Sequence, residues 1–451
     1  MTAGPPAAFN GRLIAPLILG SILNPVNSSI IAVSLVPIGR AFDAPSSSTA
    51  WLISALYLAT AIGQPVVGRL VDTLGPRRLF LAGATLTGLA GITGTLAPSL
   101  GVLVAARVIL GLGTCAGYPA AMYLIRSEAE RTGRDSPGSI LTALAVANQT
   151  IAVIGPPVGG LLIGLGGWRM TLAVNIPLAT ACVALGVARL PKTTARQSRS
   201  GDGLDLLGIA LFAAMLVSLL LFLMEAHAAT LWLLAVSTVC GGALAARELR
   251  ADDPFIDLRI LRANLPLVRT YARNLLAMTV TYAFLYGFTQ WAEDARGLSA
   301  SEAGLVLLPM PLTAIAVSSA TGRSPQLRRK LLAGAGTQAL ACLLLLTLDA
   351  GSALWLLLVV AAVMGVPQGL NSLANQNAVY RQADAQRIGA SAGLLRTFAY
   401  LGAIIASAAT GALFGRHADT AGLHSLTMLL IAVAVAFLAL TLFDRSLARV
   451  Y

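Results

Sequence analysis

The chain has 451 residues, of which 57% are hydrophobic and only 11% are charged. This composition leaves too little polar surface for a soluble globule, so we expect an integral membrane protein that crosses the bilayer many times. The net charge of +12 does not indicate nucleic-acid binding, because the basic residues lie in loops between apolar segments.

Runs of about 20 apolar residues, the length that crosses a bilayer as a helix, predict an all-α protein with fourteen transmembrane helices. Both termini are expected in the cytoplasm, because this orientation places most Lys and Arg residues on cytoplasmic loops. The expected spans are 12–38, 49–70, 78–97, 100–125, 139–165, 168–190, 205–225, 228–248, 267–291, 299–322, 328–349, 352–380, 387–414 and 422–443.

Two polar stretches, Pro191–Asp205 and Arg247–Arg273, set a helix pair apart from the six spans before it and the six after it. We therefore expect two six-helix bundles with an inserted two-helix hairpin. The predicted domains are an N-terminal bundle at 1–190, a linker, hairpin and cytoplasmic segment at 191–265, and a C-terminal bundle at 266–451. Duplicated halves around a midplane site are typical of secondary transporters.

Catalytic and metal chemistry is not expected. The cysteines lie singly inside predicted spans, and the histidines lie apart from one another near predicted outer loops. No disulfide, metal site or cofactor is therefore predicted. No HExxH or HxxxD pattern falls within a span, which argues against an intramembrane enzyme. A receptor without transport activity is also disfavoured, because the predicted tails are short.

A short charged loop joins the second and third spans. From Gly68 to Arg78 it reads Gly-Arg-Leu-Val-Asp-Thr-Leu-Gly-Pro-Arg-Arg. Its glycines allow a tight turn, and Arg77 with Arg78 is expected among anionic lipid headgroups. A shorter echo, Gly322-Arg323 followed by Arg328-Arg329-Lys330, precedes the span at 328–349 and suggests that the two bundles are duplicated halves.

The fifth span contains a cluster of small residues and prolines. Gly155 and Gly159 are four residues apart, as are Gly160 and Gly164, and this spacing lets another backbone approach closely. Pro156 with Pro157 removes two backbone donors and is expected to bend the helix. We expect a kink that controls closure on the outer side; an ordinary tight helix crossing is the alternative.

These two motifs resemble those of the major facilitator superfamily. The loop from Gly68 to Arg78 is similar to its loop motif, and Ile151–Gly160 is similar to the antiporter motif of its drug exporters. The fourth span carries Arg107, Gly111 and Gly113, as in the fourteen-helix drug:proton antiporter branch, with Leu110 where that branch commonly has glutamine. The resemblance covers nearly the whole chain and implies the major facilitator fold.

The resemblance also implies a latch. Asp72 would face the N-terminus of a helix in the opposite bundle near Gly389, oriented by Arg77, since a carboxylate is favoured at the positive end of a helix. Glu128 or Glu130 would complete this network. The conformational gating residues implied are Gly68, Asp72, Arg77, Arg78, Gly155, Pro156, Gly159 and Gly160.

The first span departs from the branch that it resembles. Drug exporters of this kind usually carry an acid there, whereas this chain has Asn24 and Asn27, which cannot take up a proton. Glu225, at the outer end of the seventh span, is the nearest alternative proton carrier. Its position is also typical of an interfacial residue.

Two arginines lie deep in predicted spans. A charge at the bilayer centre costs about 2.5–3.5 kcal/mol even on the lenient insertion scale. Arg107 and Arg396 are therefore expected either to bond backbone carbonyls and amides or to bind an anionic or zwitterionic substrate. Other candidates for a central cavity, each alternatively a helix–helix hydrogen bond, are the amides and phenols Asn24, Asn27, Gln64, Tyr118, Asn148, Gln149, Tyr282, Tyr286, Gln290, Gln368, Asn371 and Asn375.

The resemblance therefore implies a transporter that exports small amphipathic compounds by alternating access, and we expect it in a bacterial inner membrane. Its expected partners are the lipid bilayer, a small-molecule substrate and, as the family implies, protons. A monomer is expected. The alternative is a transporter of an organic anion or a lipid-like molecule, with Arg107 and Arg396 as charge contacts.

Overall fold

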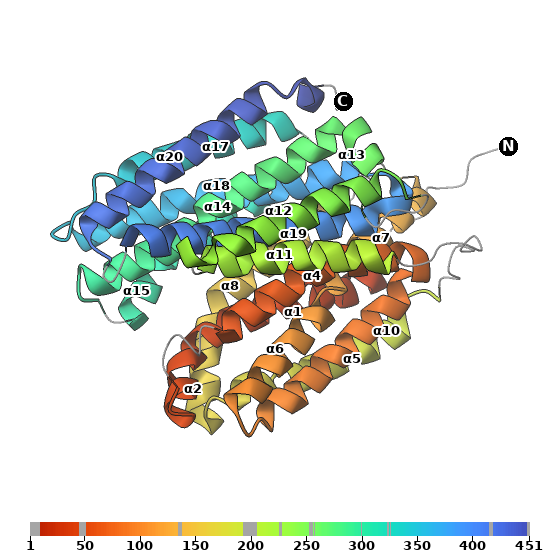
Figure 1. Cartoon of the computed structure of the whole chain (residues 1–451), viewed down its shortest axis with the longest axis horizontal. Helices are drawn as coiled ribbons and strands as arrows, with labels where there is room; N and C mark the ends of the chain where they lie inside the picture. The colour runs from red at the N-terminus through yellow and green to blue at the C-terminus, as the bar shows by residue number, and fades with distance from the viewer. Residues whose placement is uncertain are drawn as a thin grey trace. The chain divides into compact units, whose positions relative to one another are not determined.

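The computed structural model (Figure 1) describes residues 10–44, 51–133, 138–192, 205–224, 228–251, 256, 258–298, 300–322, 324, 326–414 and 418–448. Within these ranges the secondary structure is helical and no strand occurs. Helices suit a chain of this composition, because they pair backbone N–H and C=O groups within one segment everywhere except in the first and last turns.

The chain divides into two compact units. Unit 1 comprises the described residues of Met1–Leu204 and Ala383–Thr397, and unit 2 those of Asp205–Gln382 and Phe398–Tyr451. One helix, α19 (Ile388–Phe414), therefore contributes its first residues to unit 1 and the remainder to unit 2. The division into domains at 190 and 265 stays a prediction.

Unit 1 is built around close crossings of α-helices. Helix α5 runs alongside α6 and α10 (Figure 1). A Cβ atom at Gly113 would lie only 2.8 Å from the backbone nitrogen of Thr87, so α5 and α6 can approach this closely only with glycine there. The helices are η1 (Gly11–Leu13), α1 (Ile14–Ile30), η2 (Ile31–Ser34), α2 (Leu35–Ala41), α4 (Trp51–Leu74), α5 (Pro76–Thr95), α6 (Leu100–Thr114), α7 (Gly117–Thr132), α8 (Gly138–Gly166), α9 (Met170–Ala173), α10 (Asn175–Arg189), η4 (Ala385–Arg387) and the start of α19.

Unit 2 has an aromatic core on its longest helix. Phe284 and Phe288 stack with ring centroids 4.9 Å apart, and the buried Trp291 donates a hydrogen bond of 3.1 Å to the Thr420 hydroxyl. The helices of unit 2 are α11 (Leu206–Met224), η3 (Ala228–Thr230), α12 (Leu231–Glu248), α13 (Leu258–Ala263), α14 (Leu265–Asp294), α15 (Ala300–Leu307), α16 (Pro309–Thr321), α17 (Leu327–Leu345), α18 (Leu354–Gln382), the rest of α19, α20 (Thr420–Leu442) and η5 (Arg445–Ala448).

Ten helices among the described residues are long and apolar enough to cross a membrane. Each coincides with one of the predicted spans. The other four predicted spans, at 78–97, 205–225, 267–291 and 328–349, also fall on helices, which are α5, α11, α14 and α17. The helical positions predicted from hydropathy are therefore confirmed, while the number of membrane crossings stays a prediction.

Some spans differ in detail from the prediction. The first was expected as one helix over 12–38, but α1 ends at Ile30 and a 3-10 turn precedes α2. Hydroxyls explain part of this break, because Ser28 and Ser29 donate to the carbonyls of Asn24 and Pro25 and so compete with regular helix geometry. The span predicted to end at 125 continues through α7 to Thr132, where Gly133 adopts a φ of 64°.

Candidate functional site

The carboxylate of Asp72, near the end of α4, lies against the first turn of α19 within unit 1. Its Oδ1 accepts a hydrogen bond of 2.9 Å from the N–H of Gly389, and its Oδ2 accepts one of 2.8 Å from the N–H of Ala390. These N–H groups have no partner within their own helix, because they belong to its first turn. The negative charge also lies at the positive end of the helix dipole.

Small residues make this contact possible. A Cβ atom at Gly68 would lie 2.5 Å from the carbonyl oxygen of Gly389, and one at Gly389 would lie 2.7 Å from Asp72 Oδ1. Further along the same crossing, the Thr397 hydroxyl donates to the carbonyl of Ala61 at 3.1 Å. Helix α4 and the start of α19 therefore meet over several turns, and Asp72 closes one end of the contact.

The basic and acidic neighbours of this loop have other partners. Arg77, expected to orient Asp72, donates through Nη2 to the carbonyl of Val187 on α10 at 2.9 Å. Glu128 accepts from the backbone N–H of Asn10 at 2.8 Å and pairs with Arg131 at 2.6 Å. Glu130 pairs with Arg126 at 3.0 Å. The hydrogen bonds of the Asp72 carboxylate come from backbone N–H groups.

The asparagines of α1 join it to three other helices. Asn24 donates to the hydroxyl of Thr114 on α6 at 3.0 Å and to that of Thr60 on α4 at 3.4 Å. Asn27 and Asn175 exchange reciprocal amide hydrogen bonds of 2.6 and 2.8 Å between α1 and α10. Both side chains of α1 are buried, and each takes part in helix–helix hydrogen bonding.

Arg107 is almost completely buried, with 1% of its surface exposed. Its Nε donates to the carbonyl of Leu52 at 2.9 Å, and Nη1 and Nη2 lie 3.5 and 3.4 Å from the carbonyl of Asn27. The guanidinium thus joins α6 to α4 and α1 through backbone oxygens. The sequence left two roles for Arg107, bonding to backbone groups or binding a substrate. The hydrogen bonds to backbone carbonyls agree with the first role.

Arg396 has a different environment. Its guanidinium carbon lies 4.2 Å from the centre of the Tyr118 ring, a cation–π contact between the start of α19 and α7. No ion pair to Arg396 occurs among the residues that the structure describes. Gln64, beside Gly393 in the same crossing, is 2% exposed and leaves its Oε1 without a hydrogen-bond partner. The structure therefore brings three sequence candidates, Gln64, Tyr118 and Arg396, to one region of unit 1.

The remaining candidates are spread over several helices. In α8, Asn148 donates to the carbonyl of Leu144, and Gln149 is half-buried. In unit 2, Tyr282 and Tyr286 stack with centroids 5.8 Å apart, whereas Gln290 is exposed.

Helix α18 carries three further candidates. Gln368 is half-buried, and Asn371 donates to Gln338 Oε1 on α17 at 3.1 Å. Asn375 is completely buried, and neither polar atom of its amide has a hydrogen-bond partner. Helices α17 and α18 thus carry buried amides at their contact.

The glycine and proline motif of the predicted fifth span allows the close helix approach expected from its spacing at some of its glycines but not at all of them. Helix α8 is continuous through Pro156, and a Cβ atom at Gly155 would overlap the Ser29 side chain of α1. Gly159 is buried, whereas Gly160 faces open space. The proton-carrier candidate Glu225 lies outside the described residues.

One buried charge cluster was missed by the sequence reasoning. Asp444 lies just beyond α20 and pairs with Arg273 at 2.5 Å and with Arg269 at 3.0 Å, both on α14; Asp444 and Arg273 are fully buried. Burial alone would raise the pKa of Asp444, but hydrogen bonds from Ser446 and Arg273 hold that pKa below its usual range. The sequence feature that could have indicated this cluster is a pair of arginines one helical turn apart, together with an acidic residue directly after the last predicted span.

Comparison with known proteins accords with this architecture. The sequence profile of the Major Facilitator Superfamily matches residues 17–407. The uncharacterized MFS-type transporter YwoD of Bacillus subtilis is 31% identical over 449 residues, which cover 95% of this chain and 96% of that protein. The tetracenomycin C resistance and export protein of Streptomyces glaucescens is 24% identical, with 91% of this chain and 77% of that protein covered.

A solved structure is also similar. The crystal structure of the human organic anion transporter MFSD10 matches 95% of this chain and 99% of its own, with a TM-score of 0.72 and 15% sequence identity. At this identity the likeness concerns the fold alone.

Proposed function

This chain belongs to the Major Facilitator Superfamily, a family of multi-pass membrane transporters rather than enzymes, and we propose that it exports small amphipathic compounds by alternating access. Drug or metabolite efflux is the function that the relatives favour, and a bacterial inner membrane is the location that we propose. Proteins named for antibiotic resistance and export match most of this chain, among them the tetracenomycin C exporter described above.

The observation that carries this proposal is the contact of Asp72 with the N–H groups of Gly389 and Ala390. An exporter must alternate between two conformations, and it needs a contact that is strong in one state and can be released. A carboxylate on free helix N–H groups meets this need, because water can replace either partner once they separate. In our proposal Gly68, Asp72, Arg77 and Arg78 form this gate on one side, and Gly155, Pro156, Gly159 and Gly160 form a second gate on α8.

Proton coupling is part of the proposal and needs a group other than the usual acid. Asn24 stands in the corresponding stretch of α1 and is occupied by Thr60 and Thr114. Glu225 remains the proposed proton carrier. Fourteen membrane crossings, cytoplasmic termini, two bundles with an inserted hairpin and a monomeric state complete the proposed organisation.

The proposed substrate contacts begin with Gln64, Tyr118 and Arg396, which share one region of unit 1. An amide, a phenol and a guanidinium suit a ligand with both aromatic and polar parts. The other proposed contacts are Asn24, Asn27, Arg107, Asn148, Gln149, Tyr282, Tyr286, Gln290, Gln368, Asn371 and Asn375.

Proton flux from everted membrane vesicles tests the proposal. Vesicles are energised to an acidic interior and challenged with cationic, neutral and anionic compounds, with vesicles lacking the protein as the control. We expect an exported cation to collapse the proton gradient only where the protein is present. If no compound changes the gradient and none accumulates in the vesicles, drug–proton exchange is contradicted.

Transport of an organic anion or lipid-like molecule is the second candidate, and the position of Arg396 favours it. Its guanidinium stacks on Tyr118 without an ion-pair partner among the described residues, so it retains charge for an anionic ligand. Arg396→Met should then abolish transport of labelled anions and spare cations, whereas Arg396→Lys should retain part of it. Unchanged anion transport in Arg396→Met would reject this candidate.

A further inference from the structure

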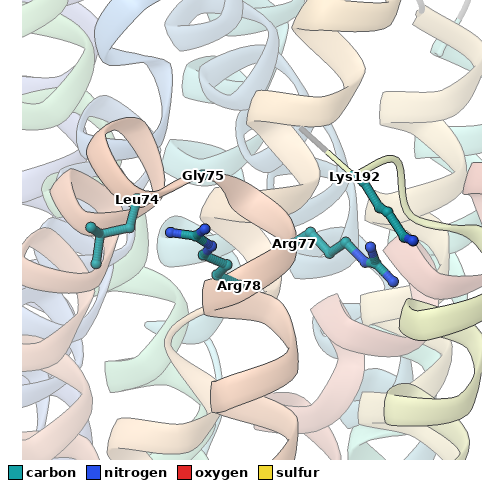
Figure 2. Close-up of a pocket in the computed structure, with 5 residues that line it drawn as sticks. All are labelled: Leu74, Gly75, Arg77, Arg78 and Lys192. Carbon is teal, nitrogen blue, oxygen red and sulfur yellow. The ribbon is translucent and has the colours of Figure 1, made fainter. Parts of the chain in front are cut away.

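A pocket with a volume of about 240 Å³ lies where α4 ends and α5 begins (Figure 2). Its lining combines the last residue of α4, the first turn of α5 and the segment just after α10. A water molecule occupies about 30 Å³ of liquid, so the pocket has room for a group several times larger. The lining residues are Leu74, Gly75, Arg77, Arg78 and Lys192.

The lining is positively charged. Figure 2 shows the ends of Arg77 and Lys192 converging on one side of the start of α5, with Arg78 directed toward Leu74. Among the residues that the structure describes, no carboxylate pairs with any of these three cations. The like charges of Arg77 and Lys192 repel one another where they converge, and an anion between them removes this cost.

Unused donors point to the same kind of ligand. Arg77 donates a hydrogen bond from Nη2 to the carbonyl of Val187, but its buried Nε has no hydrogen-bond partner. The pocket also lies at the N-terminus of the 20-residue helix α5, where Pro76 has no N–H and the N–H groups of Arg77 and Arg78 in the first turn lack intrahelical partners. A phosphate accepts hydrogen bonds from such groups and is favoured by the helix dipole. The geometry therefore suits a phosphate better than a neutral ligand.

The surroundings distinguish a lipid phosphate from a free one. Leu74 in the lining is 45% exposed, and Val187, whose carbonyl accepts from Arg77, is 56% exposed. Helix α5 exposes further large apolar side chains at Leu86 and Leu89. A cationic pocket beside exposed apolar helix surface matches an amphiphile with an anionic head and hydrocarbon tails.

We propose that this pocket binds the phosphate group of an anionic phospholipid, with Arg77, Arg78 and Lys192 around the headgroup and the acyl chains along α5 and α10. The proposal rests on the membrane location in the proposed function, but not on the substrate or on coupling. Arg77 and Arg78 belong to both proposals, but lipid binding is measured on the purified protein without transport, so the failure of either proposal can be recognised separately.

Native mass spectrometry of the purified full-length protein tests this site. The protein is titrated with phosphatidylglycerol, with phosphatidylcholine of the same acyl chains, and with inorganic phosphate. We expect phosphatidylglycerol to bind more tightly than phosphatidylcholine and to stay bound in excess phosphate. In the double variant Arg78→Gln and Lys192→Gln, we expect about a fivefold loss of affinity for each removed charge.

A second double variant is the matched control. Arg12 and Arg328 are exposed basic residues that do not line the pocket, so Arg12→Gln with Arg328→Gln removes the same net charge. We expect less than a twofold change in phosphatidylglycerol affinity. An equal loss in both double variants, or equal binding of phosphatidylcholine, would overturn the proposal. Complete displacement by inorganic phosphate would assign the pocket to a free anion instead.

Discussion

Two carboxylates, one in each unit, are held by different kinds of partner. Asp72 is half-buried and accepts hydrogen bonds from two neutral backbone N–H groups at the start of α19. Asp444 is fully buried between the guanidinium groups of Arg269 and Arg273 on α14. The first contact is a helix-end interaction, and the second is a buried ion pair.

The difference in partners implies a difference in reversibility. When a carboxylate leaves a helix N-terminus, water can bond the exposed N–H groups, so the loss is about 0.5–2 kcal/mol. When a carboxylate leaves a buried arginine, an uncompensated charge remains in the interior at a cost of about 3–5 kcal/mol. Asp72 is therefore suited to a contact that opens and closes, and Asp444 to one that stays closed.

The largest expected effect is on folding. We predict that Asp444→Asn lowers the free energy of unfolding by about 3–5 kcal/mol, because Arg273 stays buried without its counter-charge. Denaturant unfolding of the purified protein in detergent measures this loss. Asp349→Asn, in an exposed turn, is the control and should change stability by no more than about 0.5 kcal/mol. If Asp444→Asn and Asp349→Asn are equally stable, the claim that Asp444 forms a stabilising buried ion pair is contradicted.

The pH dependence of stability distinguishes the contribution of the Asp444 charge from the contribution of its side-chain packing. Its pKa in the folded protein lies below that in the unfolded chain, which is about 3.9. The stabilisation is therefore fully present above pH 4 and is lost as the pH falls through the folded pKa. We predict that the stability difference between wild type and Asp444→Asn shrinks as the pH is lowered below about 4. A difference independent of pH would indicate a packing effect.

An intermediate effect is expected where α4 crosses α19. In Gly389→Ala the new methyl group would lie 2.7 Å from both Asp72 Oδ1 and the carbonyl of Gly68, so the crossing must open. We predict a cost of about 1–3 kcal/mol to the latched conformation, measured as the distance between spin labels on α4 and η4. Gly336→Ala, on a helix face with open space, should leave the distance unchanged and stabilise the chain slightly. If the distance between the spin labels in Gly389→Ala equals that of the latched conformation in the wild type, this prediction is wrong.

The smallest effect on stability is expected for Asp72→Asn. An amide keeps one acceptor oxygen but loses the charge and the second acceptor, at a cost of about 0.5–2 kcal/mol to the latched conformation. The ratio of the two conformations should then change by about 2- to 30-fold, measured with the same spin labels. The unfolding midpoint should remain close to wild type. A loss of folding stability as large as that of Asp444→Asn would remove the distinction between the two carboxylates.

The candidate site was predictable in part. The contact of Asp72 with Gly389 was implied by the resemblance of the loop motif to the major facilitator superfamily, and helix-end electrostatics explain why a carboxylate is favoured there. The partner of Arg77 was not predictable, because its guanidinium bonds the carbonyl of Val187, 110 positions away. The same limit applied to Arg107, for which sequence indicated only that it needed an acceptor or a cavity. Its acceptors are carbonyl groups, and every residue type supplies one.

The sequence by itself determined the class of protein and the course of its helices. Long apolar runs can hide their backbone polar groups in a membrane only by forming helices, so hydropathy located these segments. The tertiary structure alone decided which side chains meet. Asn27 and Asn175 are 148 positions apart, and Arg273 and Asp444 are 171 apart. Such pairs depend on which helix faces pack together, and in apolar helices hydropathy differs too little between faces to identify them.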